Sequence, residues 1–392
     1  MTKSSSTNTS QKTLVSFPSS RKYRFYLNKR YLVGNFDIIG IESPDHFFGG
    51  RNVLTYPKEK ETLSQKLFWI LLKKIDRMVK IGARAKRKDF DASKHRVAKW
   101  LSFLINIRAL SYVFEFFMIK AFRDKKYDDI VCRYDRIELF TLCYISELYL
   151  YSAALKNKKE IFFSIDGWDI YEYFWIPSRV TLYESWGLFF DEQLQRIGIE
   201  EKKILRRNHP FRRFPRLSGK YFTIYESPER VMSITQQIFL IGIVTKFATR
   251  TNSRVRVKCL AESKIERFLI DLNVVDVYRT NIEYTDHARS VLKLRDELGD
   301  IVPDTIMFIS FGLSHGLLEF GVSGIPVLCF QRTLWESQGR LNSYLERCGV
   351  TFLNTSAHVS EAEIFKSLKT SLMIRPDFDG FLYDLESPSA TQ

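Results

Sequence analysis

Residues 303–332 read PDTIMFISFGLSHGLLEFGVSGIPVLCFQR and carry the clearest structural pattern of the chain. Its β-branched, aromatic and other apolar residues at 305–310 predict a short buried strand. Small residues follow, and apolar positions then recur at helical spacing over 313–322. A second group of glycine, serine and proline ends that helix, and 325–330 predicts another buried strand. The stretch therefore predicts one strand–turn–helix–strand unit of an α/β domain.

The turn between the first strand and the helix is the chemical feature of this unit. Ser310, Gly312 and Ser314 are small, so backbone N–H groups can converge there. The helix N-terminus adds partial positive charge, which favours a phosphate or a carboxylate. Glu319 follows one to two helical turns later, where a carboxylate accepts hydrogen bonds from sugar hydroxyls. An ordinary strand–turn–helix without a ligand remains the alternative.

The pattern S-x-G-x-S-x-G-L-L-E-x-x-x-x-G-I-P-V over 310–327 resembles the donor-nucleotide segment of GT-B glycosyltransferases. It is most similar to the bacterial enzymes that build surface polysaccharides and wall polymers, and nucleotide-sugar epimerases of the same fold share it. The resemblance implies that Ser310, Gly312, Ser314 and His315 hold the donor phosphates. It also implies that Glu319 binds the ribose.

Strand and helix patterns alternate through both halves of the chain, which favours parallel βαβ units. A Pro-, Gly- and Arg-rich break marks the domain boundary between 206 and 219. We therefore predict an α/β protein with two Rossmann-like domains facing a cleft, the GT-B layout. The expected parts are a disordered Ser/Thr-rich leader (1–20), an acceptor-side domain (21–217), a nucleotide-sugar-binding domain (218–375) and a tail (376–392).

Individual elements follow from local patterns within this layout. Residues 63–81 and 97–122 predict helices, the second buried on most sides. The apolar run at 129–134 predicts a strand, and 139–155 predicts the helix after it. A helix is also expected at 361–372.

The composition describes a globular chain of 392 residues with 45% hydrophobic residues. Its five cysteines are scattered, which argues against zinc sites and disulfides and favours a reducing cytosol. Asp-x-Asp triplets occur at 89–91 in a charged stretch and at 377–379 in the tail. Neither follows an apolar strand, so we predict no metal requirement and no cofactor.

Positive charge is concentrated in one part of the chain. The net charge is +15, and residues 58–99 contain fourteen Lys or Arg against five acids. This patch favours an anionic partner: lipid headgroups, a polyanionic glycan or nucleic acid. The helix at 63–81 has an apolar stripe flanked by lysines, which is typical of an interfacial helix and equally of a helix that covers a sheet. Charges interrupt the apolar run at 100–119, so a membrane span is not expected.

Candidate catalytic groups lie in the first half of the chain. Asp166 and Asp169 follow an apolar strand, where a carboxylate can act as general base or cap the next helix. In some bacterial sialyltransferases a similar point carries an acidic-acidic-Gly motif, although Ile165 replaces its first acid here. His46 precedes a glycine pair and is a candidate for the acceptor site, with a plain surface loop as the alternative. His209-Pro210 resembles the His-Pro pair that contacts the donor in some sialyltransferases, at an earlier place in the chain.

These features lead to one main function hypothesis and two alternatives. The main hypothesis is a metal-independent glycosyltransferase that moves a sugar from a nucleotide-sugar donor to a growing surface glycan or lipid-linked acceptor. It is expected in the cytoplasm, on the inner face of the membrane, with residues 58–99 against anionic lipid. The alternatives are a nucleotide-sugar 2-epimerase-like enzyme and a non-catalytic polyanion-binding protein. No nucleic acid is expected, because no recognition motif for one is present.

Overall fold

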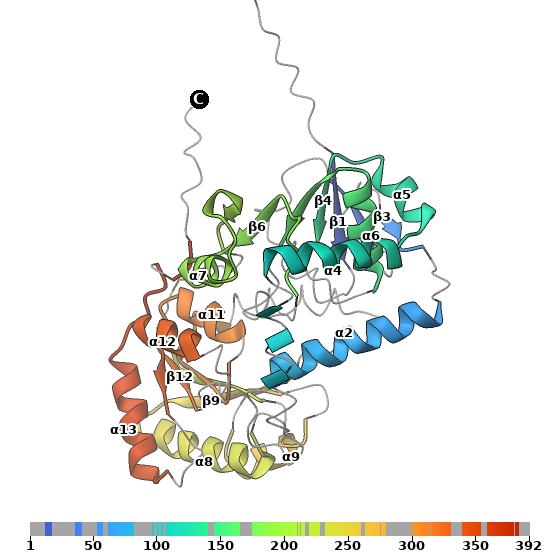
Figure 1. Cartoon of the computed structure of the whole chain (residues 1–392). Coiled ribbons are helices and arrows are strands. Elements are labelled where there is room, and N and C mark those ends of the chain that lie inside the picture. The colour runs from blue at the N-terminus through green and yellow to red at the C-terminus, as the bar shows by residue number, and fades with distance from the viewer. Residues whose placement is uncertain are drawn as a thin grey trace, which may run out of the picture. The chain divides into compact units, whose positions relative to one another are not determined.

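The computed structural model divides the chain into two compact units, Met1–Asn208 (unit 1) and His209–Gln392 (unit 2), each with its own parallel sheet (Figure 1). The structure describes residues 12–17, 36–40, 53–57, 62–81, 96–97, 100–101, 103–104, 107–139, 145–164, 175–209, 211, 213–215, 219–227, 232–259, 263–274, 276–279, 299, 301–313, 315–330, 339–353, 359–379 and 381–383.

Unit 1 contains a seven-stranded sheet with the order β3-β2-β1-β4-β5-β6-β7. Its strands are β1 (Thr13–Phe17), β2 (Phe36–Gly40), β3 (Val53–Thr55), β4 (Arg136–Leu139), β5 (Glu160–Phe163), β6 (Leu182–Ser185) and β7 (Ile204–Arg206). The helices of this unit are α2 (Leu63–Ile81), α4 (Arg108–Ala121), α5 (Lys125–Val131), α6 (Ile145–Lys156) and α7 (Leu188–Arg196), with a 3-10 turn at Glu201–Lys203.

Unit 2 contains a six-stranded sheet with the order β10-β9-β8-β11-β12-β13. Its strands are β8 (Tyr221–Tyr225), β9 (Arg254–Cys259), β10 (Asp276–Arg279), β11 (Thr305–Ser310), β12 (Val327–Cys329) and β13 (Thr351–Phe352). Its helices are α8 (Ile234–Arg250), α9 (Glu266–Leu269), α11 (His315–Val322), α12 (Gly339–Arg347) and α13 (Glu361–Leu372).

Both sheets have the Rossmann order, in which the third, second and first strands are followed by the fourth, fifth and sixth. The order reverses between β1 and β4 in unit 1 and between β8 and β11 in unit 2. In open α/β sheets, ligands bind at the carboxyl ends of the strands at such a reversal. The topology thus identifies one candidate edge in each unit.

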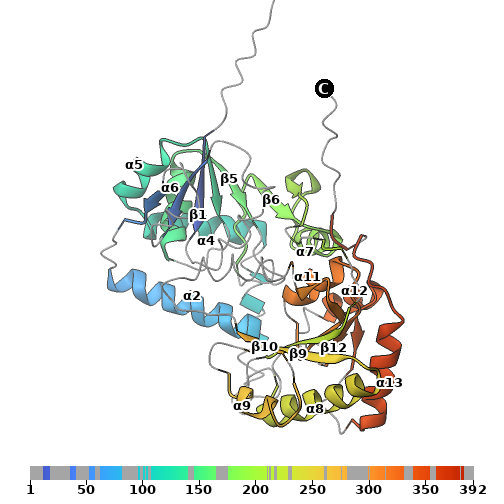
Figure 2. The same ribbon diagram turned by 180° about the vertical axis from the view of Figure 1, so that it is seen from behind.

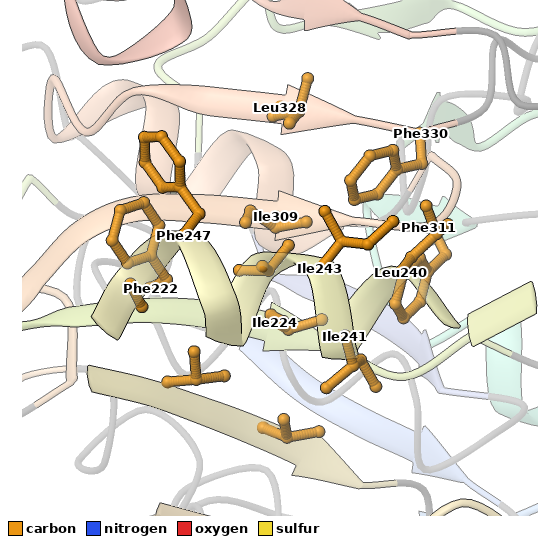
Figure 3. Packing of buried hydrophobic residues seen from close by; sticks show 14 of the residues in the cluster. Phe222, Ile224, Leu240, Ile241, Ile243, Phe247, Ile309, Phe311, Leu328 and Phe330 are labelled. Atoms are coloured by element: carbon orange, nitrogen blue, oxygen red, sulfur yellow. The ribbon is translucent and has the colours of Figure 1, made fainter. Parts of the chain in front are cut away.

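The core of unit 2 forms where α8 lies across its sheet. Figure 3 shows Leu240, Ile243 and Phe247 of α8 beside Ile224 and Ile309 of the central strands. These side chains are at most 3% exposed. A capping box fixes the start of α8, because Ser233 accepts from the Gln236 N–H while the Gln236 side chain accepts from the Ser233 N–H. This packing holds β8 and β11, and hence the candidate edge, in place.

The disordered leader predicted over 1–20 is wrong at β1. Thr13–Phe17 pairs in parallel with both β2 and β4 and lies inside the sheet of unit 1 (Figure 2). Leu14 and Ser16 are fully buried, and Val15 nearly so. The Ser/Thr-rich composition obscures this short strand, whose apolar residues are Leu14, Val15 and Phe17, and a strand buried on both faces needs no alternating pattern.

The strand predicted at 129–134 is also wrong, because 129–131 belong to the end of helix α5 and 132–134 form no strand. The Asp124 side chain accepts a hydrogen bond from the Lys126 N–H at 2.8 Å and so caps the helix. Tyr127 and Val131, four residues apart, are buried on one helical face. The strand comes later, at β4, and the following helix begins at Ile145 rather than at 139.

The helix predicted over 97–122 differs in extent and in burial. Ile107 has an extended backbone (φ −64°, ψ 126°), and α4 begins after it. One side of α4 is buried, but Val113, Phe116 and Phe117 on the other side are exposed. The helices at 63–81 and 361–372 have the predicted limits. Across the residues that the structure describes, none of the helices is both long enough and apolar enough to span a bilayer.

The boundary region and the end of the chain pack on unit 2. The division between the units falls before His209, inside the expected interval but earlier than residue 217. The Phe214 N–H donates to Ser323 Oγ at 3.0 Å. Phe378 and Phe381, in the segment expected to be a tail, are buried. The predicted tail from 376 therefore begins as part of the domain core.

Candidate nucleotide site

The predicted phosphate turn lies at the strand-order reversal of unit 2. It follows β11, which pairs with β8 on one side and with β12 on the other. At the end of β11, Ser310 is in register with Tyr225 of β8 and Cys329 of β12. Three neighbouring strands thus end at one level, and the turn leaves the sheet at the place where open α/β sheets bind ligands.

Ser310 shapes this turn through its hydroxyl group. Ser310 Oγ donates to the carbonyl oxygen of Gly312, and the Gly312 N–H points back at Ser310 Oγ at 3.5 Å. The Ser310 side chain is almost fully buried. The serine therefore holds the backbone of the turn, and the groups left to receive an anion are the N–H groups at the start of α11.

A cluster of aromatic rings packs against the start of α11, next to the turn. The Tyr225 ring packs edge-on against Phe308 and Phe320, with ring centres 4.8 and 5.8 Å away, and these two rings stack on each other at 4.3 Å. Gly316 in the first turn of α11 makes this packing possible, because a Cβ atom there would lie 2.7 Å from Tyr225 Cε2. The missing side chain lets the helix start sit directly on the Tyr225 ring.

Glu319 lies in α11 and is only 7% exposed. Helix geometry places it one turn after His315, about 6 Å along the axis. A buried carboxylate is costly without polar partners, so such a residue is rarely present for packing alone. Ser310, Gly312, His315 and Glu319 thus belong to one turn and the helix that follows it.

Lys258 is a candidate that the sequence analysis missed. It stands in β9 in register with Tyr225, and its ammonium group lies 4.4 Å from the centre of the Tyr225 ring. The residue is half-buried near the carboxyl end of its strand. An ammonium group at this edge suits a phosphate ligand. In the sequence, Lys258 is a lysine near the end of a strand in which polar and apolar residues alternate. Such lysines are common at sheet edges, so this one did not stand out.

The sequence Ser-aromatic-Gly-Leu occurs twice, at 310–313 and again after β6 at 185–188. In the second turn, Ser185 Oγ lies 3.0 Å from the Gly187 carbonyl oxygen and donates to Asp191 Oδ1. Arg206 Nε donates to the other oxygen of Asp191 at 2.8 Å. This helix start therefore already has a carboxylate of its own, with an arginine to neutralise it.

The turn after β11 has no such internal carboxylate. Asp191 stands six residues after Ser185, and the residue six positions after Ser310 is Gly316. The two turns share their first four residue types and the serine–glycine contact, but only the first carries an acid at its helix start. The difference favours the turn in unit 2 as the one suited to an external anion.

Polar groups also meet at the strand-order reversal of unit 1. Ser16 Oγ of β1 donates to Glu147 Oε1 at 3.1 Å and lies 2.6 Å from the Tyr56 hydroxyl. Glu147 is fully buried in the first turn of α6. These groups escaped the sequence analysis because the strand that carries Ser16 was assigned to the leader.

A second cluster of buried polar side chains lies at the ends of β4, β5 and β6. Arg207 Nη1 donates to Glu138 Oε1 at 3.3 Å and lies 3.5 Å from Glu184 Oε1. Ser164 Oγ also donates to Glu138 Oε1. Ser164 is the first residue after β5, so this network fixes the point at which the chain leaves the sheet toward Asp166.

The remaining predicted residues divide into two classes. Asp166, Asp169, His46 and Ser314 lie outside the described residues, and so does the side chain of His315. His209 begins unit 2 and is buried.

His209 contacts Phe211 and Tyr383 of unit 2. Its Nδ1 accepts from the Phe211 N–H at 3.1 Å, its own N–H donates to the Tyr383 carbonyl oxygen at 3.3 Å, and its ring stacks on Phe211. These contacts attach the first residues of unit 2 to the end of its chain. Within the described part of the chain, no group of three or more His, Cys, Asp or Glu residues is arranged to hold a metal ion.

No protein-family model matches the chain, and no curated protein matches it by sequence. Solved structures are similar in fold. A putative UDP-N-acetylglucosamine 2-epimerase from Listeria monocytogenes is 10% identical with a TM-score of 0.51, covering 95% of this chain and 93% of that one. The structure of S. aureus MnaA with UDP is 7% identical with a TM-score of 0.50, covering 92% and 87%. CalG4, the calicheamicin glycosyltransferase, is 9% identical with a TM-score of 0.47, covering 93% and 90%.

At these identities the similarity concerns the fold, and it extends over nearly the whole of each chain. It agrees with two parallel α/β units that both have the Rossmann strand order. The chain therefore has the GT-B fold, with two Rossmann-like domains, as the sequence predicts.

Proposed function

We propose that this protein is a nucleotide-sugar-dependent glycosyltransferase that acts on a lipid-linked acceptor or a growing surface glycan. The observation that carries the proposal is the turn at 310–313, at the strand-order reversal of unit 2, with the buried Glu319 one helix turn beyond His315. In dinucleotide folds a helix N-terminus binds the diphosphate and an acidic side chain binds the ribose, and we assign these two roles to the start of α11 and to Glu319. The similar structures named for UDP-N-acetylglucosamine and UDP agree with that ligand class.

The proposed reaction transfers a glycosyl group without a metal ion. The acceptor hydroxyl forms a bond to the anomeric carbon, while the bond from that carbon to the donor phosphate breaks. The nucleotide leaves with the bonding electron pair, and the α11 N-terminus and Lys258 stabilise its charge. Asp166 or Asp169 takes the acceptor proton as general base. His46 is the proposed acceptor-site residue of the same unit, and His209 a further donor contact.

The test of the donor site is nucleotide binding, measured as a shift in unfolding temperature with UDP, GDP, CMP and CDP. A nucleotide at one hundred times its Kd adds about 2.7 kcal/mol to the free energy of unfolding. Glu319→Gln removes a charged group that accepts hydrogen bonds from the ribose hydroxyls, so the Kd for the nucleotide should rise by about tenfold or more. Glu346→Gln makes the same chemical change on the exposed side of α12 and should leave the Kd unchanged.

Three results would contradict the proposed site. They are an absence of any shift with all four nucleotides, a shift that Glu319→Gln leaves intact, and a shift that Glu346→Gln removes equally. The first of them would favour the polyanion-binding alternative.

The second candidate is a nucleotide-sugar 2-epimerase-like enzyme, which the name of the similar structure from Listeria monocytogenes favours. It uses the same nucleotide site but needs no acceptor. Incubation with the nucleotide sugar alone separates the two functions. An epimerase changes the configuration of the bound sugar at C2, whereas a glycosyltransferase leaves the sugar unchanged until an acceptor is added.

A further inference from the structure

Helix α4 presents a broad apolar face to solvent. Val113, Phe116 and Phe117 are 53%, 49% and 60% exposed, and Leu110 and Tyr112 are also exposed. We call these five residues the α4 face. With about half of each side chain accessible, the face offers on the order of 400 Å² of apolar surface. This is as large as the largest apolar patch of a typical soluble monomer, and such patches mark interaction sites.

The opposite side of the same helix belongs to the core of unit 1. Met118 and Glu115 are buried, and Phe114 stacks with Phe68 of α2 at 6.1 Å. The helix is therefore held firmly by one side while the α4 face remains uncovered by the described part of the chain. A helix that is apolar on all sides normally lies in a core or in a membrane.

The exposed apolar surface continues in two segments that precede α4 in the sequence. Val97, Trp100, Phe103 and Ile107 precede it and are exposed. Helix α2, which contacts the end of α4 through Gln65 and Phe68, is exposed at Leu63, Leu67, Ile70 and Leu71. Solvent-facing leucines of α2 alternate with lysines, so this helix does not keep its apolar stripe against the sheet.

The charges around these helices are positive. Lys120 lies 4.4 Å from the centre of the Phe116 ring, and the Arg179 guanidinium lies 4.7 Å from the centre of the Tyr112 ring. Among the side chains of α2 and α4 that the structure describes, Glu115 is the one carboxylate, and it is buried. Residues 58–126 contain nineteen Lys or Arg and seven acids. An apolar face without exposed carboxylates and with a basic surround matches an anionic lipid surface.

We infer that the α4 face inserts into the headgroup region of an anionic phospholipid bilayer. The phenyl rings of Phe116 and Phe117 enter the apolar boundary, while Lys120 stays at the level of the lipid phosphates. The attachment is parallel to the membrane surface and does not span it. This inference extends the membrane role expected for residues 58–99 to a defined apolar face. The proposed attachment requires no nucleotide or acceptor.

Vesicle co-sedimentation of the full-length protein tests this inference. The vesicles contain either phosphatidylcholine alone or phosphatidylcholine with 30% phosphatidylglycerol. Wild type should bind the anionic vesicles and bind the neutral vesicles much more weakly. Phe117→Ser should weaken binding to anionic vesicles by about tenfold, because the exposed part of one Phe side chain no longer leaves water. Phe239→Ser is the matched control, since Phe239 is 56% exposed on α8 in unit 2, and it should bind like wild type.

The possible results separate clearly. Absence of wild-type binding to anionic vesicles overturns the inference. So does equal binding by Phe117→Ser, which would mean that charge alone holds the protein on the surface. A wild-type dimer in sedimentation velocity that Phe117→Ser makes monomeric, without vesicle binding, would identify the face as a self-association site instead. Nucleotide binding is measured without lipid, so failure of this inference leaves the proposed function untouched.

Discussion

The contact between Gly321 and Phe378 provides a sharp test of how the end of the chain packs. Gly321 lies in α11, and a Cβ atom built on it would stand 2.3 Å from Phe378 Cε2 and 2.8 Å from Phe378 Cζ. Carbon atoms pack favourably at about 3.5–4.0 Å. The substitution Gly321→Ala therefore requires the Phe378 ring to move by more than an ångström. The ring is 4% exposed and packs on Phe381, so it has little room.

The size of the effect follows from two opposing contributions. Overpacking a core site costs about 1–3 kcal/mol, and complete loss of the Phe378 contacts would cost about 3–5 kcal/mol. Alanine in a helix is about 1 kcal/mol more favourable than glycine. We expect Gly321→Ala to lower the free energy of unfolding of unit 2 by about 1–2 kcal/mol. Gly242→Ala in α8 is the control, because its Cβ atom would meet only the flexible tip of Leu272 at 3.3 Å, and it should be neutral or stabilising.

Urea unfolding of the full-length protein, followed by circular dichroism, measures these differences. The double variant Gly321→Ala/Phe378→Ala identifies the cause. Once the ring is absent, Gly321→Ala should no longer destabilise, which gives a coupling energy of about 1 kcal/mol or more. If Gly321→Ala is as stable as Gly242→Ala in the wild-type background, the residues after 376 do not pack against α11 in solution.

Two further predictions concern unit 1. Burial raises the pKa of the fully buried Glu115 above its ordinary value of 4.5. Above pH 4.5 the native state thus keeps a proton that the unfolded chain releases, and the free energy of unfolding should fall as the pH rises through the raised pKa. Urea unfolding from pH 4.5 to pH 8 should show this fall in wild type and not in Glu115→Gln, and parallel profiles would disprove it. Leu14→Ala, at a fully buried position of β1, should lower the free energy of unfolding by about 2–5 kcal/mol. Leu63→Ala, at a 74% exposed position of α2, should change the free energy of unfolding by less than about 0.5 kcal/mol. If the two substitutions lower the free energy of unfolding equally, β1 is not part of the core.

Local patterns were sufficient where a segment carries its own signals. The helix at 361–372 begins with Ser360 and Glu363 in a capping box and shows apolar spacing throughout, and the structure has the same limits. The strand–turn–helix at 305–322 was predicted from an apolar run followed by small residues. The candidate nucleotide site in unit 2 depends on this local unit, so most of its residues were accessible from the sequence.

Local patterns failed where neighbours decide the outcome. The stretch 129–134 has the apolar content of a strand, but Asp124 caps a helix that buries Tyr127 and Val131. Five residues in a polar N-terminal segment form β1, because strands on both sides supply its hydrogen bonds and cover its side chains. Neither environment can be read from the residues themselves, since each is created by segments distant in the sequence.

Local patterns in the sequence predict the alternation of strands and helices, the two Rossmann-like domains and the turn of small residues after 310, because periodicity and turn residues act over a few positions. Contacts between remote segments determine which groups meet. It put Lys258 and Tyr225 in register near Ser310 and joined Glu138, Ser164 and Arg207 from three strand ends. It also left Phe116 and Phe117 of an apolar helix uncovered. Strand order and the covering of a face depend on contacts between remote segments, and a short-range pattern carries no record of them.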